Sequence, residues 1–157
     1  MEHVISILVE NHAGVLARVA GLFSGRGYNI DSLSVAPTND PGLSRMTLVC
    51  RGDDRVIEQI NKQLNKLIDT VKVTDLTADE HIERELALVK VASTSQNRSD
   101  IIEICNIFRA RIIDVDLKSL TVEVVGAPQK VQALIELMRT FGVREIVRTG
   151  RVAISRG

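Results

Sequence analysis

The feature that most restricts the fold of this chain is an order of predicted elements, strand, helix, strand, strand, helix, strand, which occurs twice. In the first copy, apolar and β-branched runs predict strands at residues 4–9, 28–36, 45–50 and 71–76. Apolar residues at helical spacing predict helices at about 14–24 and after Asp53 or Asp54, either of which can cap this second helix. In the second copy, strands are predicted at 85–92, 110–117, 120–125 and 143–156, with helices at about 101–108 and 128–141. This order describes two split βαβ units, so we expect an α+β chain with two ferredoxin-like βαββαβ domains.

Each predicted helix is apolar along one side only. In the second helix, for example, Val56, Ile60 and Leu64 recur at i, i+4 and i+8. Both helices of a domain should therefore cover one face of an antiparallel sheet. The other face and an edge strand are then left bare, which favours side-by-side pairing of sheets and a homo-oligomer.

A polar, charged stretch at residues 77–84 separates the two copies. We therefore predict a first domain at 1–77, a linker at 78–84 and a second domain at 85–157. Within the first domain, the glycines of Gly25-Arg26-Gly27 are predicted to end the first helix in the left-handed conformation. Pro128 is well placed in the first turn of the last helix.

Composition excludes several classes of protein. The 20 basic and 20 acidic residues cancel, and only four aromatic residues occur, with no Trp. A nucleic-acid binder usually carries a basic excess and aromatic stacking platforms, so none is expected here. No apolar run reaches the roughly 18 residues of a membrane span. The N-terminus lacks a basic segment followed by an apolar stretch, so we expect no signal peptide. Two widely separated cysteines fit a reducing, cytoplasmic setting.

Residues suited to catalysis are not gathered in any recognisable pattern. The histidines His3, His12 and His81 lack the spacing of a metal site or a catalytic triad. Cys50 and Cys105 occupy apolar positions of a strand and a helix, so we expect them in the core. We therefore predict no catalytic residue and no metal site.

The loop from Glu10 to Gly14 is the best candidate for a binding site, because it leads from a buried strand directly into a helix. First-turn N–H groups have no partner within a helix and attract anions. Gly14 has no side chain to shield them, and Asn11 offers a donor and an acceptor. The loop therefore suits the carboxylate of an amino acid. The alternative is that Asn11 or His12 only caps the helix.

A second candidate element is the start of the second strand, where Asn29 and Asp31 flank Ile30. Polar residues there suit an edge strand that resists aggregation. They also suit a second wall for a ligand, with Asn29 facing it and Asp31 available to an ammonium group.

The run Ile7-Leu8-Val9-Glu10-Asn11-His12-Ala13-Gly14-Val15-Leu16-Ala17-Arg18-Val19 resembles the opening of an ACT domain. Its continuation at 21–35 and the segment at 43–47 resemble the small regulatory subunit of acetolactate (acetohydroxyacid) synthase. Residues 84–86, 107–115 and 148–157 resemble the C-terminal domain of that family. The resemblance covers essentially the whole chain.

This resemblance implies a non-catalytic subunit that activates the large catalytic subunit and confers feedback inhibition by valine or related branched-chain amino acids. It implies a homodimer formed through the ACT domains. The effector would lie between two subunits, and the residues implied to surround it are Asn11, His12, Ala13, Gly14, Val15 and Leu16 of one subunit and Asn29 and Ile30 of the other. No cofactor is expected in this chain, whereas thiamine diphosphate, magnesium and FAD are expected in the catalytic partner.

Two questions stay open from the sequence. A stand-alone ACT-type amino-acid sensor acting on another partner would share the same pocket. The basic last strand, with Arg144, Arg148, Arg151 and Arg156, is either a solvated face or a docking surface for the large subunit or a nucleotide.

Overall fold

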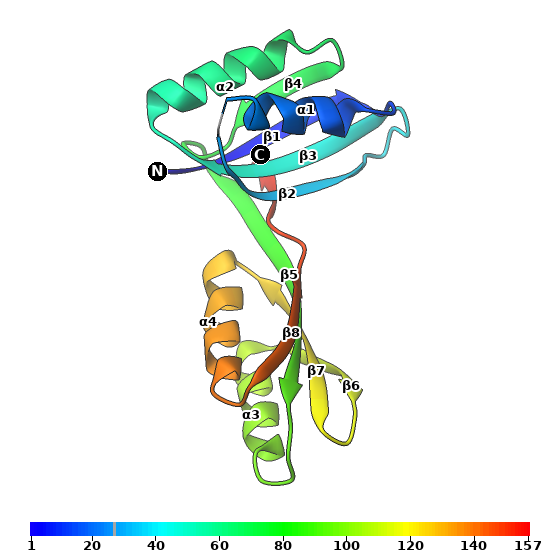
Figure 1. Ribbon diagram of the computed structural model, residues 1–157, viewed down its shortest axis with the longest axis vertical. Coiled ribbons are helices and arrows are strands. Elements are labelled where there is room, and N and C mark those ends of the chain that lie inside the picture. Colours follow the sequence, from blue (N-terminus) through cyan, green and yellow to red (C-terminus); the bar gives the residue numbers. More distant parts are fainter. Residues whose placement is uncertain (27) are drawn as a thin grey trace. The chain divides into compact units, whose positions relative to one another are not determined.

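The computed structural model describes residues 1–26 and 28–157, which form two compact units (Figure 1). The first unit contains Met1–Ile82 and Arg151–Gly157, and the second contains Glu83–Gly150. Each unit has its own apolar core. The predicted α+β class with two ferredoxin-like βαββαβ folds is confirmed by the element order and the sheet topology.

The first unit is a four-stranded antiparallel sheet with two helices on one face (Figure 1). Its elements are β1 (Glu2–Glu10), α1 (Val15–Ser24), β2 (Ile30–Pro37), β3 (Leu43–Arg51), α2 (Asp54–Lys66) and β4 (Thr70–Asp75). The strand order is β2-β3-β1-β4, so β2 and β4 are the edges. Phe23 of α1 and Ile60 and Leu64 of α2 are fully buried against the sheet, as their helical spacing predicts.

The N-terminal end of α2 and the C-terminal end of α1 can be compared with their predictions. Asp53 caps α2, because its side chain accepts the Val56 N–H at 2.9 Å. α1 ends at Ser24 with Gly25 as its C-cap, as predicted, but the expected left-handed conformation is wrong at Gly25, which has a right-handed φ of −64° and donates its N–H to the Gly21 carbonyl. Gly27, the other glycine of that prediction, lies outside the described residues.

The second unit repeats the arrangement around its own core. Its elements are β5 (His81–Ala92), α3 (Arg98–Phe108), β6 (Arg111–Val115), β7 (Ser119–Gly126), α4 (Pro128–Arg139) and β8 (Val143–Arg148). The strands follow the order β6-β7-β5-β8, and Pro128 opens α4 as predicted. None of the helices in the described part of the chain is long and apolar enough to cross a membrane.

The C-terminal segment differs from its prediction as one strand at 143–156. The structure ends β8 at Arg148 and begins a separate strand, β9 (Val152–Ser155). Gly150 breaks the strand because its φ of 75° is left-handed. The segment after this turn belongs to the first unit, where Arg151 pairs with the Glu2 carboxylate at 2.5 and 3.1 Å. The compact units therefore differ from the expected second domain of 85–157 in its last seven residues.

The predicted linker at 78–84 is also partly strand. β5 begins at His81, because β9 pairs with it and extends the ladder toward the N-terminus of β5. The Arg156 N–H donates to the Glu80 carbonyl at 3.0 Å, and the Arg156 guanidinium pairs with the Glu80 carboxylate at 3.0 Å. The polar composition of this stretch reflects these exposed pairs.

Candidate effector site

The predicted loop lies where β1 ends and α1 begins. Gly14 is the N-cap of α1 with φ 86° and ψ −6°, and no side chain of the described residues caps this helix. The alternative that Asn11 or His12 caps the helix is therefore wrong. The N–H groups of Leu16 and Ala17 belong to the first turn and have no acceptor within the helix. They provide the positive, donor-rich end that an anion requires.

Hydrogen bonds hold the loop in this conformation. The Asn11 N–H donates to the Gly42 carbonyl at 2.9 Å, and the Asn11 side-chain amide donates to the Pro41 carbonyl at 3.2 Å. The His12 ring nitrogen Nε2 lies 2.9 Å from the Glu10 carboxylate. The two Asn11 hydrogen bonds anchor the loop to the turn between β2 and β3, whereas the His12 contact lies within the loop.

A charged pair beside the loop is an additional feature that the sequence did not predict. Arg18, one turn into α1, donates from Nε to the Asp69 carboxylate at 2.9 Å and pairs with it again through Nη2. The Asp69 side chain is only 10% exposed, whereas that of Arg18 is 48% exposed. A Cβ added to Gly14 would lie 3.3 Å from Arg18 Nη1, so the guanidinium also borders the open helix end. The site therefore contains a cation that faces solvent.

Three potential metal ligands meet at the same place, although no metal site was predicted there. The ligand atoms of Glu10, His12 and Asp69 lie within 4.8 Å of one another. Each already has a partner, because His12 contacts Glu10 and Asp69 pairs with Arg18. This group is better described as one hydrogen-bonded pair, His12 with Glu10, and one ion pair, Arg18 with Asp69, than as a metal centre.

The other predicted effector residues of this loop and helix differ in how far their side chains are exposed. Ala13 is exposed and Leu16 is 43% exposed, so both can contact a ligand. Val15 is 4% exposed and packs into the core, so its backbone, but not its side chain, faces the loop.

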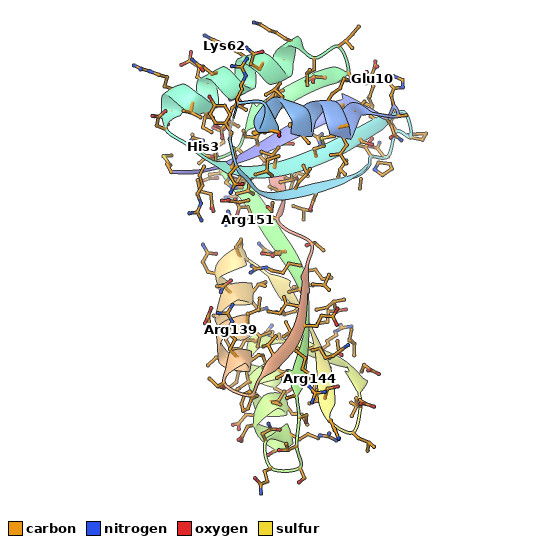
Figure 2. All side chains as sticks on the ribbon, viewed as in Figure 1. His3, Glu10, Lys62, Arg139, Arg144 and Arg151 are labelled. Atoms are coloured by element: carbon orange, nitrogen blue, oxygen red, sulfur yellow. The ribbon has the colours of Figure 1, made fainter. Side chains whose placement is uncertain are left out.

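Asn29 and Ile30 lie at the opposite end of the sheet within one chain. Ile30 pairs with Cys50, which pairs with His3 near the start of β1, whereas the loop follows Glu10 at its end. Figure 2 labels His3 and Glu10 toward the two ends of this strand. Seven residues of extended chain span roughly 23 Å. One chain therefore does not bring the two predicted halves of the site together.

Two side chains near Asn29 have structural roles. Asp31, considered for an ammonium group, pairs with Arg51 at 2.8 Å. Cys50 is fully buried, as predicted, and burial, followed by the charges of Asp75 and Asp31, raises the pKa of its thiol to about 11. A thiol with this pKa stays protonated near neutral pH and is a poor nucleophile.

The first unit thus combines a βαββαβ sandwich with an uncapped helix terminus that is entered through a glycine, an arrangement typical of the ACT class of domains. Residues 5–72 match the model of the acetolactate synthase (AHAS) small subunit-like ACT domain, and residues 84–157 match the model of the small subunit of acetolactate synthase. The chain belongs to the acetolactate synthase small subunit family.

Individual relatives match along the full length. A probable acetolactate synthase small subunit of Archaeoglobus fulgidus is 55% identical over 157 residues, which is 100% of this chain and 98% of the relative. The acetolactate synthase small subunit of Aquifex aeolicus is 51% identical over 156 residues, covering 99% of this chain and 81% of the relative. The crystal structure of the small subunit from Thermotoga maritima matches with a TM-score of 0.92 and 44% identity, covering 100% of this chain and 98% of that chain.

Proposed function

We propose that this chain is the regulatory subunit of a two-component acetolactate synthase, and that it activates the large catalytic subunit and makes it sensitive to valine or a related branched-chain amino acid. The observation that carries this proposal is the open N-terminus of α1 at Gly14, within a chain of the small-subunit family. The effector carboxylate accepts hydrogen bonds from the N–H groups of Leu16 and Ala17. Arg18 adds positive charge beside them.

The effector site requires two copies of the chain. Gly14 and Asn29 lie at opposite ends of the sheet in one chain, so a pocket that contains both takes one residue from each subunit. β2 is an edge strand, and its pairing with the β2 of a second copy would bring these opposite ends together. We therefore propose a homodimer through the ACT domains, with effector contacts from 11–16 of one subunit and 29–30 of the other.

The chemistry is assigned to the partner. Acetolactate formation, with thiamine diphosphate, magnesium and FAD, takes place in the large subunit, and this chain has no catalytic residue of its own. Both subunits act in the cytoplasm. The effector changes the activity of the partner only through different affinities for two states of the assembly, a coupling typically about 1–3 kcal/mol.

The small differences in apolar surface among amino acids limit how well the site can distinguish one effector from another. Valine has two methyl groups more than alanine, which gives about 1–3 kcal/mol of discrimination. Leucine and isoleucine differ from valine by one methylene, so discrimination among the three is modest. Most of the binding free energy comes from the charged ends, where each charge-assisted hydrogen bond contributes about 1.5–3 kcal/mol.

Reconstitution tests this function. The purified chain alone should form no acetolactate, should raise the activity of the large subunit on mixing, and should be required for inhibition by valine. Turnover by the chain alone, or inhibition of the large subunit to the same extent without it, would contradict the assignment. Stable capture of a different partner from the source cell would instead support the stand-alone sensor.

A further inference from the structure

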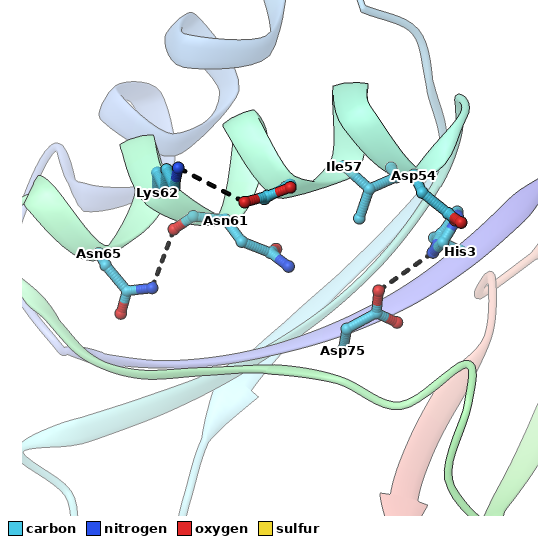
Figure 3. A pocket seen from close by; sticks show the side chains of 8 residues that line it. His3, Asp54, Ile57, Asn61, Lys62, Asn65 and Asp75 are labelled. Carbon is cyan, nitrogen blue, oxygen red and sulfur yellow. Dashed lines mark hydrogen bonds and ion pairs between the residues drawn. The ribbon is translucent and has the colours of Figure 1, made fainter.

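A cleft lies on the first unit between α2 and the strands β1 and β4, and none of its lining residues belongs to the loop at Gly14 (Figure 3). This cleft measures about 350 Å³. The polar residues that line it are His3, Asp54, Glu58, Asn61, Lys62, Asn65 and Asp75. Carboxylates and an imidazole therefore dominate it, and its one lysine is already paired, with Nζ 3.4 Å from the Glu58 carboxylate.

His3 is the unusual residue of this cleft. It is 4% exposed, and its Nε2 has no hydrogen-bond partner among the described residues. Leaving a buried polar atom without a partner costs about 1–3 kcal/mol, so such an atom normally has a ligand or an ordered partner. Figure 3 shows the ring of His3 between Asp54 and Asp75.

Asp75 determines which ring nitrogen of His3 is the acceptor. His3 Nδ1 lies 3.0 Å from Asp75 Oδ2, and the Thr77 N–H donates to Asp75 Oδ1 at 3.0 Å. A carboxylate only accepts hydrogen bonds, so the proton of the neutral imidazole is on Nδ1 and Nε2 carries the lone pair. A carboxylate behind the imidazole is the arrangement that orients histidine ligands toward metal ions.

Asp54 supplies a second ligand atom on the other side of the gap. Its Oδ1 lies 3.9 Å from His3 Nε2, and its side chain is 92% exposed. The neighbouring Asp53 is occupied as the cap of α2, whereas the Asp54 carboxylate accepts no hydrogen bond from residues 1–26 or 28–157. Two bonds of about 2.0–2.1 Å in tetrahedral geometry place their donor atoms roughly 3.4 Å apart. A shift of about 0.5 Å by an exposed side chain closes this gap, with no change in the backbone.

We propose that His3 Nε2 and the Asp54 carboxylate bind a divalent transition-metal ion of the zinc type, with water completing its coordination in the cleft. Imidazole nitrogen combined with carboxylate oxygen selects such an ion over magnesium or calcium, which prefer oxygen ligands alone. The bound ion would join the start of β1 to the start of α2. This site is separate from the proposed effector site and shares no residue with it.

Zinc titration of the full-length, chelator-treated chain tests the proposal by calorimetry and by nitrogen NMR of the histidine rings at a fixed pH of about 7.5. We expect one ion per chain and a shift of the His3 Nε2 resonance. His3→Asn retains an amide that can donate to Asp75 but removes the ligand atom, so affinity should fall about tenfold or more. Asp54→Asn, at an exposed position, should also weaken binding severalfold.

Matched controls separate the site from general charge effects. Glu58→Gln removes a carboxylate of the same cleft that is paired with Lys62, and it should leave zinc affinity within about threefold. His12→Ala and His81→Ala should have equally small effects. An unshifted His3 resonance, an unchanged affinity in Asp54→Asn, or a loss of binding in His12→Ala would overturn the proposal. The NMR and Asp54 results decide the question even if His3→Asn does not fold.

Discussion

Replacing Gly14 with aspartate tests whether an effector carboxylate lies at the start of α1. The new carboxylate would occupy the space in front of the first-turn N–H groups, where the ligand is proposed to bind. We expect Gly14→Asp to weaken valine binding and to shift inhibition to higher valine concentrations, because two like charges then compete for one helix terminus.

The expected size of the effect follows from the geometry. Two unit charges about 5 Å apart interact by about 3 kcal/mol at an effective dielectric constant of 20. Arg18 offsets part of this repulsion, because its Nη1 lies 3.3 Å from the Cβ position of residue 14. If half of the repulsion remains, valine affinity falls about tenfold, since about 1.4 kcal/mol corresponds to a factor of ten.

Gly14→Asn is the matched control, because asparagine has the same shape without the charge. Both residues tolerate the left-handed φ of 86° better than other side chains, so the backbone cost is shared. Calorimetry on each variant measures valine affinity, and the reconstituted enzyme measures inhibition. Equal valine affinity in the aspartate and asparagine variants would refute the placement of the effector carboxylate at this terminus.

Three further changes probe the rest of the molecule. Asn29→Ala should weaken valine binding by about 1 kcal/mol without changing the thermal midpoint, since this side chain is exposed; wild-type affinity by calorimetry would argue against a pocket shared by two subunits. Ile60→Ala should lower the free energy of unfolding by about 2–5 kcal/mol in urea, because Ile60 is fully buried; an unchanged midpoint would contradict its core role. Burial alone would raise the pKa of Asp75, but hydrogen bonds from Thr77 and His3 outweigh it and lower this pKa below 3.8. The ionised carboxylate therefore stabilises the fold above about pH 4 and loses this effect as pH falls through the folded-state pKa, so Asp75→Asn should flatten acid unfolding curves; curves that match the wild type would count against this role.

The helices and strands could be predicted from the sequence because each is determined mainly by the pattern of apolar and polar residues within one short segment. The stripe of Val56, Ile60 and Leu64 needed only helical periodicity, and two of these three side chains are fully buried. The capping role of Asp53 could be predicted from its position just before a helix that is apolar along one side. The division of the C-terminal segment could not be predicted in this way, because Val152 onward continues the β-branched pattern of β8 across Gly150.

In the candidate site, too, features set by consecutive residues were predicted, whereas contacts between residues far apart in the sequence were not. A glycine before an apolar helix is a local signal, and it correctly placed an open helix end at residue 14. The pairing of Arg18 with Asp69 joins residues 51 positions apart, and no sequence spacing marks it. It arises because β4 lies beside β1, where the Glu10 N–H donates to the Asp69 carbonyl at 2.8 Å. The sequence thus predicted a site made of backbone N–H donors, without a charged side chain. The structure adds the Arg18 guanidinium beside these donors. Its positive charge reduces the repulsion between a bound carboxylate and an aspartate introduced at residue 14.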